Sequence, residues 1–358
     1  MDYNSIRRRT RKVNAGHVEI GGDSHVSIQS MTNTDTHDRD ATFAQVCNLE
    51  NAGCDIVRLA VPDIEAVDTI SYIKSRNVNV PIVADIHFDY KIALASVNAG
   101  VDKIRINPGN IGSHDRVVEV ARACEYNGIP IRIGVNSGSL QKSILAKYGG
   151  PCAEALAESA LCHAEILESV GFSDIVISVK ASSVYTMIET NRILAKKTDY
   201  PLHLGVTEAG SEAKGSVKSA VGIGSLLSEG IGDTIRVSLT SDPVNEVRTA
   251  IDILSSLGIY KKKMMDIISC PTCGRTKIEL IELLRKFENE IDVRGLRTKP
   301  IKVAFMGCAV NGPGEATEAD IGIAGGVGEA LMFRHGVITG KVPSDRIVEI
   351  LIEEIERM

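Results

Sequence analysis

The stretch Ile129-Pro-Ile-Arg-Ile-Gly-Val-Asn136 decides the fold of the longer part of the chain. Its branched apolar residues alternate with Arg132, Gly134 and Asn136, which is the period-two pattern of a β-strand. Other apolar runs of strand length occur along the chain, and segments with helical periodicity separate them. The eight runs together cover residues 26–31, 55–61, 80–86, 103–107, 129–136, 174–180, 202–207 and 234–239.

Eight strand–helix units in a row, over roughly 200 or more residues, are typical of a (β/α)8 TIM barrel. The helical segments include 40–53 and 115–128, and each ends at a glycine. A doubly wound sheet is the alternative, but neither Gly-x-Gly-x-x-Gly nor a Walker loop follows the first run. We therefore predict an α/β protein that begins with a TIM barrel.

The pattern changes after the eighth run and predicts a second, smaller α/β domain. We expect residues 1–258 to form the barrel, with a hairpin at 12–22 that closes its bottom, and residues 259–358 to form the small domain. The sequence predicts helices at 244–257, 277–288 and 344–358, the last with Ser344 as N-cap, and a strand at 301–306.

Composition narrows the function. The chain has 358 residues, a net charge of -6, 4% aromatic residues and no Trp, which argues against binding to nucleic acid or to an anionic membrane. The basic amino terminus is not followed by an apolar stretch, and no run is long enough to span a bilayer. We therefore expect a cytoplasmic protein, in which the eight Cys do not form disulfides.

Polar residues share one face of the predicted strands. In the run 103–107, Ile104 and Ile106 oppose Arg105 and Asn107, and the other runs repeat this alternation. The apolar face must meet the surrounding helices, so the polar face points into the barrel. Five cations then converge on one cavity: Arg58, Arg105, Arg132, Lys180 and Arg236.

Buried charge needs a partner, and few acids, chiefly Asp85 and Glu208, are placed to supply one. Arginine forks suit phosphate oxygens, so the sequence predicts a polyanionic ligand at the carboxyl ends of the strands. Acids from other loops could instead pair with these cations. His87 follows Asp85 on the same face and is a further candidate.

Three cysteines indicate a metal centre in the small domain. Cys270-Pro-Thr-Cys273-Gly places two thiols within reach of one metal, and Cys308 follows the predicted strand at 301–306. Three thiolates are one short of the four that usually hold a cubane, so the fourth iron is either open or bound by an oxygen such as that of Glu315. Zinc is the rival, with Cys308 and His335 completing a Cys3His site. Spacing alone leaves both readings open.

Five motifs together resemble the 4-hydroxy-3-methylbut-2-enyl diphosphate synthase family, in its bacterial two-domain form, over essentially the whole chain. They are Gln29-Ser-Met-Thr-Asn-Thr-Asp-Thr36, Val83-Ala-Asp-Ile-His-Phe-Asp-Tyr90, Arg105-Ile-Asn-Pro-Gly-Asn-Ile-Gly112, Cys270-Pro-Thr-Cys-Gly-Arg275 and Met306-Gly-Cys-Ala-Val-Asn-Gly-Pro-Gly-Glu-Ala316.

The resemblance implies an iron–sulfur oxidoreductase of isoprenoid precursor biosynthesis that opens and dehydrates 2-C-methyl-D-erythritol 2,4-cyclodiphosphate. It implies a 4Fe–4S cluster, two electrons from flavodoxin or ferredoxin, and a homodimer. By motif match, the cluster ligands are Cys270, Cys273, Cys308 and Glu315. The substrate-binding residues are Arg58, His87, Arg105, Arg132, Asn136, Lys180, Arg236 and Ser238.

The same resemblance places Glu208 near the reacting carbons as an acid and Asn311 beside the cluster. Glu315 would also act in catalysis by giving up its place on the iron. Two other functions are compatible with parts of the sequence. One is a non-redox barrel transferase with a zinc-stabilised appendage, and the other is a structural or RNA-binding cluster protein, which the acidic net charge disfavours.

Overall fold

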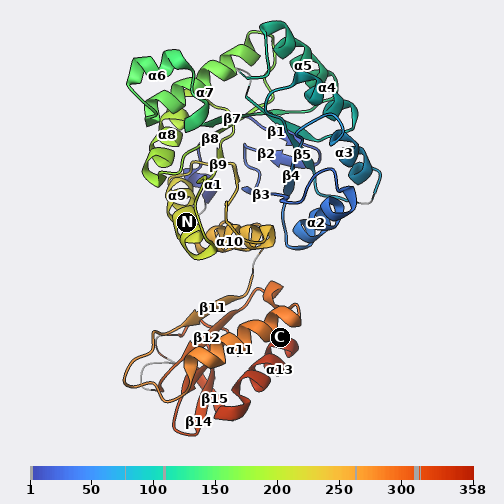
Figure 1. Ribbon diagram of the computed structural model, residues 1–358. Helices are drawn as coiled ribbons and strands as arrows, with labels where there is room; N and C mark the ends of the chain where they lie inside the picture. The colour runs from blue at the N-terminus through green and yellow to red at the C-terminus, as the bar shows by residue number, and fades with distance from the viewer. Residues whose placement is uncertain (1–2, 77, 108–109, 263, 310–313, 315) are drawn as a thin grey trace. The chain divides into compact units, whose positions relative to one another are not determined.

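The structure is a computed structural model, and it describes residues 3–358 apart from 77, 108–109, 263, 310–313 and 315 (Figure 1). The chain divides into two compact units, Met1–Lys261 and Lys262–Met358. Lys261, in the cationic run that begins at this boundary, forms an ion pair with the buried carboxylate of Asp55 in the first unit. Within the described ranges, every helix is too short or too polar to cross a membrane.

The first unit is the TIM barrel that the eight runs predict. Its parallel sheet has the order β8-β7-β6-β5-β4-β3-β10-β9, and an isolated bridge between Ile177 and Leu202 links β8 to β9. The strands are β3 (Ser27–Met31), β4 (Ile56–Ala60), β5 (Ile82–Asp85), β6 (Lys103–Ile106), β7 (Ile131–Asn136), β8 (Ile175–Lys180), β9 (His203–Leu204) and β10 (Thr234–Ile235).

Helices surround the barrel strands, as Figure 1 shows, and bury their apolar faces against the sheet. They are α2 (Arg39–Asn51), α3 (Val67–Lys74), α4 (Tyr90–Asn98), α5 (His114–Tyr126), α6 (Lys142–Tyr148), α7 (Ala153–Glu168), α8 (Val184–Lys197), α9 (Glu212–Ser228) and α10 (Pro243–Ser256). Two short pieces complete the unit's helices, α1 (Tyr3–Ile6) and the 3-10 turn η1 (Ser137–Ser139). One connection, between β7 and β8, carries both α6 and α7, so the alternation is not strictly one helix to one strand.

The last two barrel strands are shorter than the sequence predicts. Regular pairing ends at Leu204 and Ile235, although the apolar runs continue to 207 and 239. Beyond Ile235 the backbone N–H of Leu239 donates to the carboxylate of Glu246 on α10, at 3.0 Å, in place of a strand partner. In the segment after β10, a side chain of α10 thus takes the place of a strand partner for Leu239.

A two-stranded hairpin closes the amino end of the barrel. It consists of β1 (Val13–Ala15) and β2 (Val18–Ile20), paired antiparallel. Four fully or nearly buried side chains of the hairpin, from Val13, Ala15, Val18 and Ile20, form one apolar cluster with inward-facing residues of β4, β5 and β8. The barrel interior is therefore sealed by apolar packing on this side.

The second unit is a five-stranded mixed sheet with helices α11 (Leu280–Val293) and α13 (Ile347–Arg357) (Figure 1). The strands, in sheet order, are β11 (Asp266–Ser269), β12 (Lys302–Met306), β13 (Ile321–Gly325), β14 (Glu329–Arg334) and β15 (Val337–Pro343). Strands β11, β12 and β13 are parallel, whereas β14 and β15 run antiparallel to their neighbours. Only β12 matches a predicted strand.

Two predicted helix starts were wrong. Helix α11 begins at Leu280 and not at 277, because the backbone N–H of Lys277 bonds to the carbonyl of Gly307 and ties this segment to the end of β12. Ser344 does not cap the last helix. It begins a 3-10 turn, η3 (Ser344–Arg346), and α13 starts only after it. A second turn, η2 (Leu296–Thr298), follows α11.

Candidate active site

A pocket of about 200 Å³ opens among the carboxyl ends of the barrel strands. Residues paired between neighbouring parallel strands point to the same side, as Arg105 and Arg132 do, so strand register gathers the polar face in the interior. The lining residues are Arg58, Asp85, His87, Arg105, Arg132, Gly134, Asn136, Ser178, Lys180, Thr207 and Arg236. The structure thus brings together all five cations named from the sequence, with His87 and Asn136 beside them.

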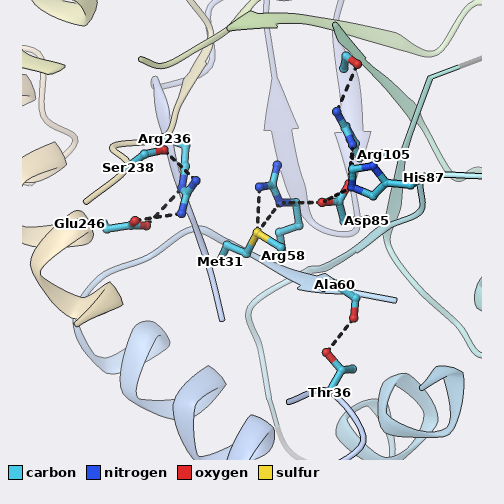
Figure 2. A network of polar contacts seen from close by, with 11 residues as sticks. Met31, Thr36, Arg58, Ala60, Asp85, His87, Arg105, Arg236, Ser238 and Glu246 are labelled. Carbon is cyan, nitrogen blue, oxygen red and sulfur yellow. Dashed lines mark hydrogen bonds and ion pairs between the residues drawn. The ribbon is translucent and has the colours of Figure 1, made fainter. Parts of the chain in front are cut away.

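Asp85 is the acid at the centre of this group (Figure 2). Its carboxylate lies 3.0 Å from Arg105 Nη1, 3.7 Å from Arg58 Nε and 3.6 Å from His87 Nε2. Burial alone would raise the pKa of Asp85, but Arg58, His87 and Arg105 together lower it well below its usual range. Asp85 is therefore ionised and fixes two guanidinium groups.

Gly134 makes room for one of those groups. A Cβ at this position would collide with the guanidinium of Arg105, whose Nη2 donates to the carbonyl of Gly134 at 3.2 Å. Arg58 is held on its other side by Met31, whose sulfur accepts from Nη2 at 2.8 Å (Figure 2). Burial lowers the pKa of Arg58 to about 10, with Asp85 acting in the opposite direction.

Two cations of the pocket have no acid partner in the part of the chain that the structure describes. Arg132 is only 1% exposed, and its Nε and Nη2 atoms find no hydrogen-bond acceptor among the described residues. The same holds for Nζ of the buried Lys180. Burial lowers the pKa of both groups well below the ordinary value, and neighbouring arginines lower it further. Buried donors without acceptors are costly, so this arrangement favours a ligand that brings acceptors.

Arg236 is matched by an acid that sequence reasoning missed. Glu246 is 4% exposed on α10, and its oxygens lie 2.9 Å from Arg236 Nη2 and 3.2 Å from Nε (Figure 2). The same carboxylate accepts from Ser30 Oγ at 2.8 Å. In the sequence Glu246 looks like an ordinary acid in the first turn of a helix. The alternative that an acid from elsewhere in the chain pairs with these cations therefore holds for Arg236, although Glu246 lies on a helix and not on a loop.

The side chains that line the pocket carry more positive than negative charge. Five cations line the pocket, and two carboxylates pair with them in the described part of the chain, those of Asp85 and Glu246. Three positive charges are therefore in excess if all five cations are protonated. Phosphate oxygens offer both the charge and the acceptors that this pocket lacks.

Glu208 and Ser238 lie beside the pocket and do not line it. Glu208 follows Thr207 after β9 and is exposed, so it does not offset the interior charge as the sequence predicted. Its backbone φ of 52° is unusual for a residue with a side chain, and such outliers concentrate at functional sites. Ser238 Oγ accepts from Arg236 Nη1 at 2.7 Å and steadies that guanidinium.

A second polar layer lies inside the barrel, and sequence reasoning missed it. Lys103 is fully buried, shares the strand parity of Arg105 and has no hydrogen-bond partner for Nζ among the described residues. His203 on β9 is also fully buried. Burial, then the charge of Arg132, lowers the pKa of Lys103 well below its ordinary value. The alternation that identified Arg105 would have identified Lys103 as well.

The second unit brings its three candidate thiols to one end of the sheet. Cys270 follows β11 and Cys308 follows β12, which are parallel neighbours. The backbone N–H of Gly307 donates to Cys270 Sγ at 3.1 Å. Hydrogen bonds from Arg275 lower the pKa of the exposed Cys273 thiol and favour its thiolate. This donor set fits a group held by sulfur.

The three thiols do not lie close enough to one another to bind a single metal ion in this structure. Among the described residues, no three His, Cys, Asp or Glu side chains lie close enough together to hold one metal ion. Glu315 and Asn311, the two other positions that the resemblance implies at the cluster, lie outside the described residues.

The position of His335 argues against the zinc alternative. His335 lies in the turn between β14 and β15, and its backbone N–H donates to the carbonyl of Ala319 at the beginning of β13. Cys308 follows Met306, which pairs with Ala324 at the other end of β13. Five residues of extended chain, roughly 16 Å, separate the two levels of the sheet. His335 and Cys308 therefore cannot share a metal in this arrangement.

Comparison with known families agrees with the two-unit architecture. Residues 10–251 match the GcpE TIM-barrel domain, and residues 266–357 match the GcpE protein C-terminal domain. Among solved structures, a phospho-2-dehydro-3-deoxyheptonate aldolase from Thermotoga maritima is similar with a TM-score of 0.51 and 12% identity, covering 70% of this chain and 75% of that one. That likeness concerns the barrel fold alone.

Curated relatives match along nearly their whole length. The 4-hydroxy-3-methylbut-2-en-1-yl diphosphate synthase (flavodoxin) of Clostridium acetobutylicum is 58% identical over 98% of this chain and 99% of its own. The enzymes of the same name from Clostridium perfringens and Geobacillus thermodenitrificans are 58% and 56% identical over 98% of this chain, and over 99% and 93% of their own. With both of its units matched in order, the chain belongs to the GcpE family, whose curated members named here are 4-hydroxy-3-methylbut-2-en-1-yl diphosphate synthases.

Proposed function

We propose that this chain catalyses the reductive ring opening and dehydration of 2-C-methyl-D-erythritol 2,4-cyclodiphosphate to 4-hydroxy-3-methylbut-2-enyl diphosphate. The observation that carries the proposal is the excess of buried cations over acids at the mouth of the barrel. A diphosphate supplies negative charge and several acceptor oxygens in one ligand. The relatives' names and the family assignment give the identity of the diphosphate.

The cations of the pocket hold the diphosphate in different ways. Arg132 and Lys180 have unused donors in the interior, so they are free to donate to phosphate oxygens. Asp85 holds the guanidinium groups of Arg58 and Arg105, both of which line the pocket. Such fixed donors stabilise the charge that develops on the diphosphate oxygen when the ring opens, without having to reorganise.

The proton for the departing hydroxyl comes from Glu208 in this proposal. Glu208 directly follows Thr207, which lines the pocket, and its backbone is held in a left-handed conformation. A positioned carboxylic acid in this place can protonate a leaving oxygen. His87 and Asn136 line the same pocket and would complete its contacts with the substrate, and Ser238 would act through Arg236.

The family is one of 4Fe–4S enzymes, and such a cluster supplies electrons and Lewis acidity when it is bound. We assign its ligands to Cys270, Cys273 and Cys308, with Glu315 as the fourth. The N–H of Gly307 that bonds Cys270 Sγ is the kind of donor that stabilises a thiolate ligand. Glu315 would also take part in catalysis by leaving its ligand position.

The partners follow from the same assignment. We propose flavodoxin, the donor printed in the relatives' names, as the source of two electrons, with ferredoxin as the alternative. We further propose a homodimer that works in the cytoplasm, and light scattering of the purified protein measures its mass in solution.

An anaerobic assay tests the function. The protein is purified without oxygen, its iron and sulfide are quantified, and the cyclic diphosphate is added with reduced methyl viologen. We expect a brown, iron-containing protein that forms the linear diphosphate. A colourless, zinc-containing protein without turnover would instead support the transferase alternative.

A further inference from the structure

A groove in the second unit runs from the Cys270 loop along helix α11. It has a volume of about 380 Å³, and most of its wall is apolar. Six of its lining residues are Cys270, Pro271, Leu280, Ile281, Leu284 and Arg285. The helical positions among them belong to one side of α11, and the second half of the wall is the cysteine loop itself. We call this surface the α11 groove.

Apolar residues of the groove are exposed to solvent. Ile281 is 73% exposed at the amino end of α11, and Pro271 is exposed beside it. Phe287 and Ile291 are fully buried and fix the helix to the sheet, and Leu280 belongs to the same core cluster. Ile281 lies about 100° around the helix from Leu280, at the edge of this buried face. The helix is therefore anchored by its buried face, and Ile281 and Pro271 form an exposed apolar strip at the edge of that face, which is a common property of docking surfaces.

Positive charge borders this strip. The segment Cys270-Pro-Thr-Cys-Gly-Arg-Thr-Lys-Ile278 contains two cations and no acid. Arg285 lines the groove, and in the described part of the chain it forms no ion pair. Two acids are near, Glu288 within the groove and Glu279 before the helix. Three cations against two acids make the border locally positive on a chain whose net charge is -6.

The wall of the α11 groove includes a residue that the proposed function uses as a cluster ligand. Cys270 belongs to its wall, so a protein seated in the groove approaches a cluster ligand without crossing the sheet. Electron transfer requires such proximity, and long-range charge attraction speeds the encounter of two proteins.

We infer that the α11 groove is the docking surface for an acidic flavodoxin, which contacts the apolar strip and pairs its acids with Arg275, Lys277 and Arg285. The inference rests on the proposed function, because that function requires an electron donor. It adds where the donor binds and which residues recognise it.

Matched substitutions at the two ends of α11 test the inference. Ile281→Asp and Arg285→Glu alter the groove. Val293→Asp and Arg294→Glu are the controls, because both positions are exposed at the far end of the helix, with Val293 about 18 Å along the axis from Ile281. Each holoprotein is assayed with reduced flavodoxin and, separately, with reduced methyl viologen. The dissociation constant for oxidised flavodoxin is measured by calorimetry.

We expect the groove variants to raise the KM and the dissociation constant for flavodoxin at least tenfold, while turnover with methyl viologen changes less than twofold. The wild-type KM for flavodoxin should also rise with salt. The inference is overturned if groove and control variants bind flavodoxin alike, or if the groove variants lose viologen activity as well. A wild-type protein inactive with methyl viologen would contradict the proposed function itself.

Discussion

The two candidate centres of this chain are built in different ways. In the barrel, the charged groups project from strands whose register is fixed by the sheet, and Arg132 and Asp85 are buried among them. In the second unit, the thiols lie on loops beyond the strand ends, and Cys273 is exposed. A site on strands is organised by the fold before any ligand arrives, whereas a site on loops depends on local hydrogen bonds and on what binds there.

Thiol reactivity should show this difference most strongly. Burial raises the pKa of Cys54 and of Cys124 to about 12, whereas hydrogen bonds lower the pKa of Cys273 below its ordinary value. In protein freed of iron, we expect iodoacetamide to modify Cys273 at least roughly a thousand times faster than Cys54 or Cys124 at pH 7.5. Peptide mass spectrometry measures the rates. Comparable rates would contradict the predicted contrast, and reconstituted cluster should protect Cys273.

Substitution of Arg236, which has an acid partner, and of Arg132, which has none among the described residues, should affect the protein differently. Arg236→Met leaves the buried carboxylate of Glu246 without its cation, so we expect it to lower the free energy of unfolding by about 3 kcal/mol. Arg132→Met removes a buried charge that has no acid partner in the described residues, and it should leave stability equal or higher while the substrate KM rises at least tenfold. Urea unfolding and steady-state kinetics measure the two effects. Equal losses of stability would refute the distinction.

Acid should weaken the barrel more than the second unit. Burial lowers the pKa of His163 on α7 to about 4, whereas an unfolded histidine titrates near 6.5. Between these values the unfolded chain binds a proton that the folded chain does not. Stability therefore falls as the pH falls through this window and levels off below pH 4.

We expect His163 to contribute a loss of about 2 kcal/mol between pH 7 and pH 5. His163→Gln should remove that part of the pH dependence, and His335→Gln in the second unit should not. Calorimetry at both pH values measures the difference. A His163→Gln protein as acid-sensitive as the wild type would show that another group is responsible.

The smallest effect concerns the backbone of Glu208. Glycine adopts a positive φ without strain, so Glu208→Gly should raise the free energy of unfolding by up to about 1 kcal/mol. Turnover should fall in this variant and in Glu208→Gln, because both lack the acid. A fully active Glu208→Gln protein would remove Glu208 from the proposed mechanism.

Most of the barrel could be predicted because strand alternation is a local pattern. The run 129–136 separates apolar from polar positions by parity, and the structure places Arg132, Gly134 and Asn136 in the pocket. The family assignment confirmed the resemblance and the barrel fold. The second unit was harder to predict, because glycines in β13 and β15 and polar residues in β14 and β15 obscure the alternation.

Partners from distant segments could not be predicted from the sequence. Glu246 pairs with Arg236 across the space between α10 and the strand ends, and nothing in the first turn of that helix distinguishes it from a solvent-exposed acid. The same carboxylate accepts from the backbone N–H of Leu239, in the segment after β10 that the sequence predicted as strand. Tertiary contacts of this kind outweigh local preferences at the margins of a sheet.

The hairpin β1–β2 closes the amino end of the barrel, so in the described part of the chain the interior is open only at the carboxyl ends of the strands. Val13, Ala15, Val18 and Ile20 fill the amino end, so a molecule that enters among the strand ends has to leave the way it came. Substrate and product then enter and leave through the same opening, so a bound product molecule prevents substrate from binding. Inhibition by product should consequently be competitive with the cyclic diphosphate, however the electrons are delivered.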